Sequence, residues 1–165
     1  MLSLRPRAGD RGSVALWVIV FTFAVIVLTA LIVDGGQLLN AKERAADVAE
    51  QAARAAVDDV NVAALRGGTV AINADACAPG GPAASVVASY AQGIGATAVI
   101  PAAYGGRLGC STGTVLRAAG AQHFATVTVE ITTVPVIPIG IFGSYQVPGQ
   151  ATAYLECGIN QGVAC

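Results

Sequence analysis

The four cysteines are the residues whose chemistry is easiest to place, because thiols form disulfides or bind metal ions. They are Cys77, Cys110, Cys157 and Cys165. Three pairings are open, and proximity along the chain favours Cys77–Cys110 together with Cys157–Cys165. A zinc site is the alternative. It is disfavoured because the sequence has no C-x-x-C pair and His123 is its only histidine.

The remaining polar residues are poorly suited to catalysis. The sequence contains no G-x-S-x-G, H-E-x-x-H or Walker motif and no strand–G-x-G-x-x-G–helix unit. A Ser-His-Asp triad would have to use His123, which opens a predicted strand. From residue 67 onward the charged side chains are Asp75, Arg107, Arg117, Glu130 and Glu156, too few for a paired-carboxylate hydrolase. We therefore predict a protein that is not an enzyme and has no cofactor, metal ion or small-molecule substrate.

The composition excludes two further classes of protein. The 165 residues are 55% hydrophobic and 12% charged, which is the opposite of an intrinsically disordered chain. Nine Lys and Arg stand against ten Asp and Glu, so no basic excess is available to neutralise phosphates. Nucleic acid is therefore not an expected partner.

Much of the hydrophobicity lies in one segment, residues 14–33, which holds twenty residues without a charge. As a helix this segment would measure about 30 Å, the thickness of a bilayer core. Trp17 stands near its N-terminal end, where an amphipathic ring suits the membrane interface. The segment predicts a transmembrane helix, and a buried core helix is the alternative.

A cleaved secretory signal is a further alternative, because Arg5, Arg7 and Arg11 form a positive N-terminal region. The apolar run is longer than a signal peptide needs. Its best cleavage candidate, Leu28-Thr29-Ala30, is followed by more apolar residues. We therefore expect the segment to remain as an anchor.

The distribution of charge predicts the orientation of that anchor. Residues 1–12 carry three Arg and one Asp, whereas residues 34–66 carry four basic and six acidic side chains. The positive-inside rule places residues 1–13 in the cytoplasm and the rest outside, which makes the chain a single-pass protein of the cell membrane. All four cysteines then lie in an oxidising compartment, where disulfides form.

The fold class that we predict is α+β, with a long transmembrane helix that continues into an amphipathic helix and packs with a small antiparallel sheet. Residues 34–66 form the second helical segment: apolar residues, mostly Ala, recur at spacings of three and four from Gln37 to about Leu65, and Gly67-Gly68 ends the helix. Asp34 marks the outer interface, and Gly35-Gly36 can kink the helix there.

Residues 67–165 form the predicted outer domain. Alternating apolar and polar residues predict strands at 125–133 and 150–156, which should pair antiparallel. A helix is expected at 82–92, and shorter strands at 69–72, 97–100 and 114–116, with a Gly-rich loop at 105–113.

The connection at residues 134–143 is apolar and contains two prolines, which exclude a central strand and a regular helix. It either folds over the core of its own domain or docks on a partner or the membrane surface. The side chains available for such a contact are Val136, Ile137, Ile139, Ile141 and Phe142.

Three stretches, taken in order, resemble one known family. They are RGSVA before the apolar span, VDGG after it, and the helix LLNAKERAADVAEQAARAAV. With the later pattern GSYQV…ATA they resemble the TadE/TadG-like proteins of the Tad (Flp-type) pilus machinery, over residues 11–57 and more loosely 124–156. The resemblance implies a pilin-like layout and a membrane-anchored minor pilin or pilus-assembly component, whose partners are the bilayer and other pilus or secretion-system subunits.

Some members of this family are cut by a prepilin peptidase after a Gly, with a Glu at the fifth mature position. The resemblance would place the cut between Gly12 and Ser13, which makes Trp17 the fifth residue. An acid within the apolar segment is therefore missing, and we favour an uncut protein.

Two other functions remain open at this point. One is a membrane-tethered extracytoplasmic binding module unrelated to pili, which would use residues 134–143 or 101–113. The other is a secreted enzyme released by signal cleavage.

Overall fold

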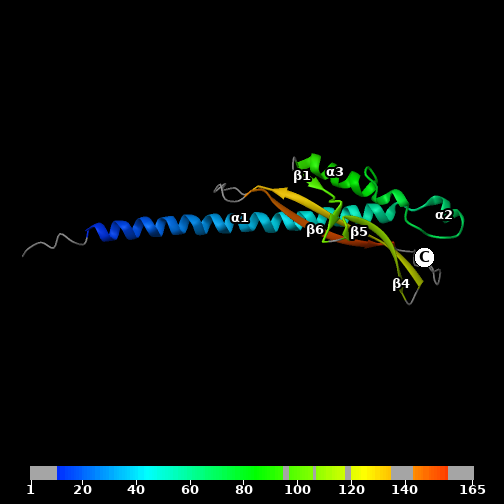
Figure 1. Ribbon diagram of the computed structural model, residues 1–165, viewed down its shortest axis with the longest axis horizontal. Coiled ribbons are helices and arrows are strands. Elements are labelled where there is room, and N and C mark those ends of the chain that lie inside the picture. Colours follow the sequence, from blue (N-terminus) through cyan, green and yellow to red (C-terminus); the bar gives the residue numbers. More distant parts are fainter. Residues whose placement is uncertain (1–10, 95–96, 106, 118–119, 135–142, 156–165) are drawn as a thin grey trace, which may run out of the picture.

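A single helix, α1, runs from Arg11 to Asp58 and dominates the molecule (Figure 1). The computed structural model describes residues 11–94, 97–105, 107–117, 120–134 and 143–155. At 1.5 Å per residue the 48 residues of α1 extend about 72 Å. The predicted continuation of the apolar span into the Ala-rich segment is confirmed, and the helix passes through Gly35 and Gly36 without interruption.

The C-terminal end of α1 differs from the prediction, which carried one helix to about Leu65. After Asp58 the chain turns, and a separate short helix, α2, spans Val62–Arg66. Asn61 causes the break: its side-chain oxygen accepts hydrogen bonds from the backbone N–H groups of Ala63 and Ala64, both at 3.0 Å. Gly67 caps the C-terminal end of α2. The sequence predicted that Gly67-Gly68 would end the helical segment here.

The strand expected at residues 69–72 is absent from this described part of the chain. Only an isolated antiparallel bridge joins Val60 and Ile72, with the Asn61 N–H donating to the carbonyl of Ala71 at 2.8 Å. One bridged pair is too little for a ladder. The 3-10 turn η1, Ala74–Cys77, follows and leads into helix α3, Pro82–Ile94, which confirms the helix expected at 82–92.

The main sheet is built around β5, Gly120–Thr133. One side of β5 pairs with β1 (Thr97–Val99) and β4 (Cys110–Arg117), and the other side pairs with β6 (Tyr145–Tyr154). All of these pairs are antiparallel, so the predicted pairing of the two alternating segments is confirmed. Pro148 lies in β6, an edge strand, where a residue without an N–H is tolerated.

The Gly-rich segment expected to be a loop at 105–113 is partly β-structure. Strands β2 (Ala103–Tyr104) and β3 (Arg107–Leu108) form a small hairpin, and β4 already begins at Cys110. The carbonyl of Gly109 accepts the N–H of Thr128 at 2.6 Å, next to the Cys110–Val127 pair, so this hydrogen bond continues the β4–β5 pairing by one residue. Thr128, which alternation placed on the solvent side, is buried.

The core lies between the C-terminal half of α1, the inner face of β5 and β6, and α3 (Figure 1). The side chains of α1 that it buries recur every three or four residues and are almost all small: Ala45, Val48, Ala49, Ala52, Ala53, Ala56 and Val57. Val127 and Val129 of β5 face them and are fully buried. An alanine surface lets a sheet approach a helix closely, and the α+β layout predicted from the sequence is confirmed.

Strand β6 approaches α1 closely at Gly149, which pairs with Val129. A Cβ atom at this position would lie 2.5 Å from the carbonyl oxygen of Ala45 and closer still to the carbonyl carbon. The obstacle is backbone and cannot rotate away. Glycine is therefore required here so that β6 can rest directly on α1.

Candidate functional site: an apolar anchor and an open groove

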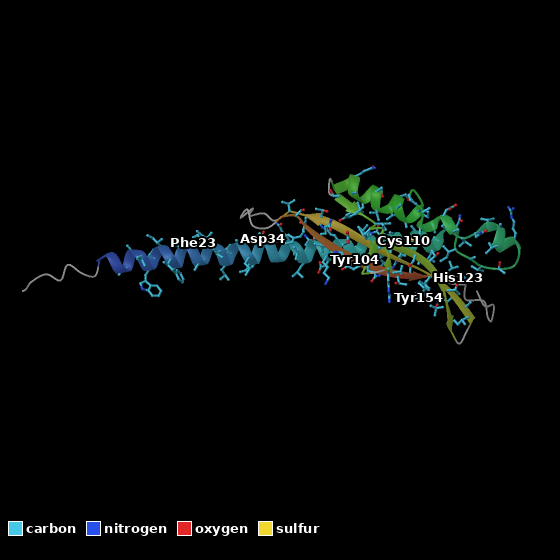
Figure 2. All side chains as sticks on the ribbon, in the orientation of Figure 1. Phe23, Asp34, Tyr104, Cys110, His123 and Tyr154 are labelled. Atoms are coloured by element: carbon cyan, nitrogen blue, oxygen red, sulfur yellow. A yellow bond between two sulfur atoms is a disulfide. The ribbon has the colours of Figure 1, made fainter. Side chains whose placement is uncertain are left out.

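The first half of α1 presents an apolar surface that nothing in the described structure covers. From Val14 to Val33 every residue is exposed except Ala30. Large side chains point outward on all sides, among them Trp17 at 71% and Phe23 at 69% exposure (Figure 2). Among the described residues this is one helix whose length and composition would let it cross a membrane. A buried core helix is excluded by this exposure.

The two hydroxyl groups within the apolar span are already satisfied. Thr22 donates to the carbonyl of Val18 and Thr29 to the carbonyl of Val25, each at 2.8 Å. A hydroxyl that bonds to its own helix needs no water. These two threonines therefore present no unmet hydroxyl group to lipid.

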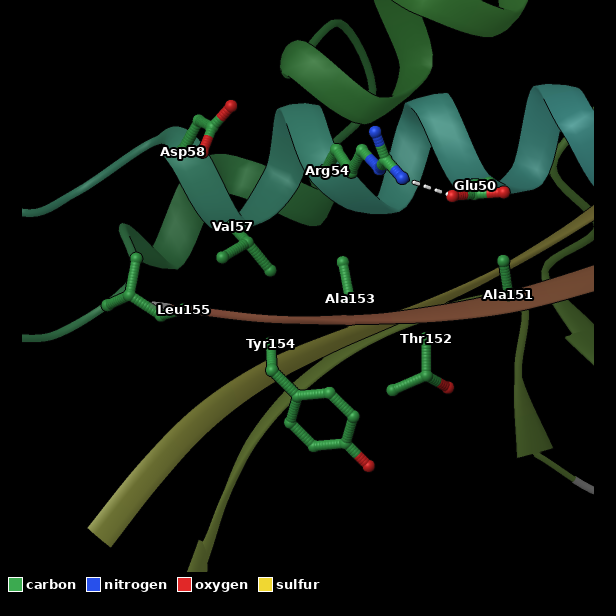
Figure 3. Close-up of a pocket in the computed structure, with 9 residues that line it drawn as sticks. All are labelled: Glu50, Arg54, Val57, Asp58, Ala151, Thr152, Ala153, Tyr154 and Leu155. Carbon is green, nitrogen blue, oxygen red and sulfur yellow. Dashed lines mark hydrogen bonds and ion pairs between the residues drawn. The ribbon is translucent and has the colours of Figure 1, made fainter. Parts of the chain in front are cut away.

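A groove opens where the last turns of α1 pass the edge strand β6 (Figure 3). We call it the α1–β6 groove. Its volume is about 730 Å³, and its lining residues are Glu50, Arg54, Val57, Asp58 and residues 151–155. Ala151 and Ala153 point from β6 toward α1, whereas Thr152 and Tyr154 point to the opposite face of the sheet (Figure 3).

The floor and the rim of this groove differ in chemistry. Val57 and Leu155 are buried and make the floor apolar. The rim carries an ion pair between Glu50 and Arg54, one helical turn apart, whose side chains are 54% and 69% exposed. An apolar floor beside an exposed charged pair and an edge strand fits a protein segment better than a reacting small molecule.

A second recess of about 740 Å³ lies between η1, α3 and β1. Every side chain that lines it is apolar or a disulfide sulfur, so it offers no charged group to orient a polar ligand. The disulfide between Cys77 and Cys110 forms part of its wall, with the two Cα atoms 5.5 Å apart. This is the pairing favoured from the sequence, whereas Cys157 and Cys165 lie outside the described residues.

His123 makes a cross-strand contact near the start of β5. Its Nδ1 atom lies 3.1 Å from the Thr114 hydroxyl, to which it is paired across β4 and β5. Thr126 and Thr152 make a similar contact at 2.8 Å across β5 and β6. These are contacts that hold strands in register. Within the described ranges no group of three or more His, Cys, Asp or Glu could hold a metal ion.

The other residues singled out from the sequence are placed as follows. Gly12 and Ser13 lie in the first turn of α1. Val136, Ile137, Ile139, Ile141 and Phe142 lie outside the described residues, and so does the centre of the 134–143 connection. Sequence reasoning missed the α1–β6 groove and the role of Gly149. A glycine inside a strand pattern is a signal for close backbone approach, and it was available.

Comparison with known proteins finds a family match, and it covers the long helix. Residues 12–59 match the model of the Tad family, described as "Putative Flp pilus-assembly TadE/G-like". No curated protein and no solved structure gives a significant match to the chain. The matched residues coincide almost residue for residue with α1. The predicted resemblance is therefore confirmed over residues 12–59, where the chain is similar to the TadE/G-like family of Flp pilus-assembly proteins.

Proposed function

We propose that the chain is a non-enzymatic, single-pass membrane component of a Flp-type pilus or a related secretion system, either a minor pilin or an assembly protein. One observation carries this proposal. The helix that matches the pilus-assembly family has an uncovered apolar half and a half packed beneath a sheet. A protein built in this way holds a folded domain at a membrane surface and leaves its faces for contacts with neighbouring subunits.

The proposed orientation puts residues 1–13 in the cytoplasm, residues 14–33 in the bilayer, and both the helical segment 34–66 and the domain 67–165 outside. Its support is the excess of Arg before the span. The Cys77–Cys110 disulfide is a second support, because such bonds persist on the oxidising side of a membrane.

The α1–β6 groove is the proposed contact with a neighbouring subunit. Its floor is apolar, its rim is charged, and the edge strand β6 offers backbone groups for pairing. Since the Glu50–Arg54 pair stands at the rim and is more than half exposed, it contributes little to the fold and is available to a partner.

A charge reversal with a matched swap tests this proposal. In a strain that lacks the gene, the wild-type chain should restore surface pili, whereas Arg54→Glu should reduce them. We expect Arg54→Glu to lower the affinity for the neighbouring subunit about tenfold, because the rim would then carry two carboxylates and no guanidinium group for the partner to meet. Pili counted by electron microscopy and subunits co-purified with the chain are the measurements.

The control is the double exchange Glu50→Arg with Arg54→Glu, which restores the pair within α1 but reverses its polarity toward a partner. If pili stay low in the exchange, the pair contacts a neighbour. If the exchange recovers wild-type pili, the pair only stabilises α1 and the groove is not the contact. A strain that loses no pili when the gene is deleted would overturn the pilus role itself.

The N-terminus is proposed to remain uncut. The mass of the protein purified from membranes should then correspond to a chain that retains Gly12 and the residues before it. A chain that begins at Ser13 would show prepilin-type processing instead. A chain that begins near residue 31 would show signal cleavage and would overturn the anchored protein.

A further inference from the structure

A second apolar surface lies at the base of the domain, where the sheet meets α1 just beyond the membrane span. Three side chains form it, one from α1, one from the end of β5 and one from the start of β6, and we call them the collar: Leu38, Val134 and Tyr145. Val134 is 68% exposed and Leu38 is 42% exposed. Exposed aliphatic side chains of this size, grouped at one end of a domain, indicate a contact surface.

The collar is continuous with the anchor. The end of β5 and the start of β6 come directly against α1, because Thr133, Val134 and Tyr145 enclose a small space of about 20 Å³ together with Asp34, Gln37 and Leu38. Figure 2 places Asp34 at this junction. The sheet therefore begins within one to two helical turns of the last residue of the apolar span.

The geometry of α1 sets the height of the collar above the hydrocarbon. Leu38 is five residues beyond Val33, which corresponds to about 7.5 Å along the helix. The headgroup layer on each side of a bilayer is roughly 5–8 Å thick. When residues 14–33 fill the hydrocarbon core, the collar must lie within or directly on the headgroup layer.

We propose that the collar rests in the headgroup layer of the outer leaflet, so that the domain makes a lipid contact of its own beside its anchor. This inference depends on the proposed function only in that α1 spans the bilayer. Leu and Val gain free energy by leaving water, and Tyr is a residue that membrane interfaces favour. A lipid contact on one side of α1 also fixes the rotation of the domain about the axis of α1.

The far end of the same sheet provides a matched control. Leu116 is 86% exposed and lies in β4 opposite Ala121, near the start of β5. From Ala121 to Thr133 the strand extends about 40 Å. Leu116 is thus as apolar as the collar residues and more exposed, and Figure 1 shows its strand, β4, at the end of the sheet away from the apolar half of α1.

Tryptophan fluorescence in lipid vesicles tests the inference on the full-length chain. Trp17 is the only tryptophan, so Trp17→Phe gives a silent background. Val134→Trp and Leu116→Trp are each placed in that background and reconstituted in phosphatidylcholine vesicles with or without brominated acyl chains, which quench nearby indoles. We expect V134W to be quenched clearly more than L116W but less than Trp17 in the wild-type chain, because the headgroup layer lies just outside the hydrocarbon that holds the bromine atoms.

The outcomes separate the collar from the anchor. Quenching of Trp17 together with equal, weak quenching of V134W and L116W would overturn the lipid contact and leave the anchor intact. A V134W emission that is blue-shifted but not quenched would overturn it as well, because the site would then be covered by protein, either its own chain or a second copy. Failure to quench Trp17 itself would overturn the membrane span, and the collar with it.

Discussion

Gly149→Ala should lower the free energy of unfolding of the domain by about 3 kcal/mol, although it adds a single methyl group. The added Cβ would meet the backbone of Ala45, which cannot move without displacing α1. Separation of β6 from α1 should therefore expose the amides of β5 to exchange. Hydrogen–deuterium exchange of residues 125–133, measured on the full chain in detergent micelles, should become about a hundredfold faster.

Gly93→Ala is the matched control for this substitution. Gly93 lies in α3, and a Cβ added there would meet nothing within 4 Å. The same chemical change should then be neutral or stabilising by up to about 1 kcal/mol, since alanine is the better helix former. Equal exchange rates in the two variants would contradict the close contact between β6 and α1.

Removal of the disulfide by Cys77→Ala with Cys110→Ala should cost about 3–4 kcal/mol. The bond closes a loop with a sequence separation of 33, and the chain-entropy model gives this magnitude for a loop of that length. The bond also ties η1 to the first residue of β4, so both should lose protection from exchange in the double variant. The measurement is denaturant unfolding of the full chain in micelles, with and without a thiol reductant.

The reductant separates this bond from the predicted Cys157–Cys165 pair. The wild-type chain should lose stability when it is reduced, and the double variant should lose only what the second pair contributes. A double variant as stable as the oxidised wild-type chain would contradict the expected contribution of the disulfide. A double variant that is indifferent to the reductant would show that Cys157 and Cys165 do not stabilise the domain.

The elements that sequence alone could place are those whose pattern is local. The charge-free run of residues 14–33 and the three-and-four spacing of alanines predicted α1, and strict alternation predicted β5. The pairing of β5 with β6 also followed, because consecutive strands usually pair as neighbours.

What the sequence could not place depends on contacts between distant residues. The end of α1 at Asp58 reflects a cap at Asn61 and a bridge from Val60 to Ile72, neither of which shows in helical periodicity. The early start of β4 at Cys110 depends on its pairing with Val127 and on the disulfide. The α1–β6 groove forms between two elements that lie about ninety residues apart in sequence, so no local motif predicts it.

The unbroken course of α1 ties the membrane segment and the domain to one helical phase. Each residue of an α-helix advances the chain by about 1.5 Å and turns it by about 100°. Insertion of one residue between Gly36 and Ala41 would therefore raise the domain only slightly, but it would rotate the sheet by more than a quarter turn about the anchor. The number of residues between the apolar span and Ala41 thus sets the angle about the α1 axis at which the domain presents its edge strand to its neighbours.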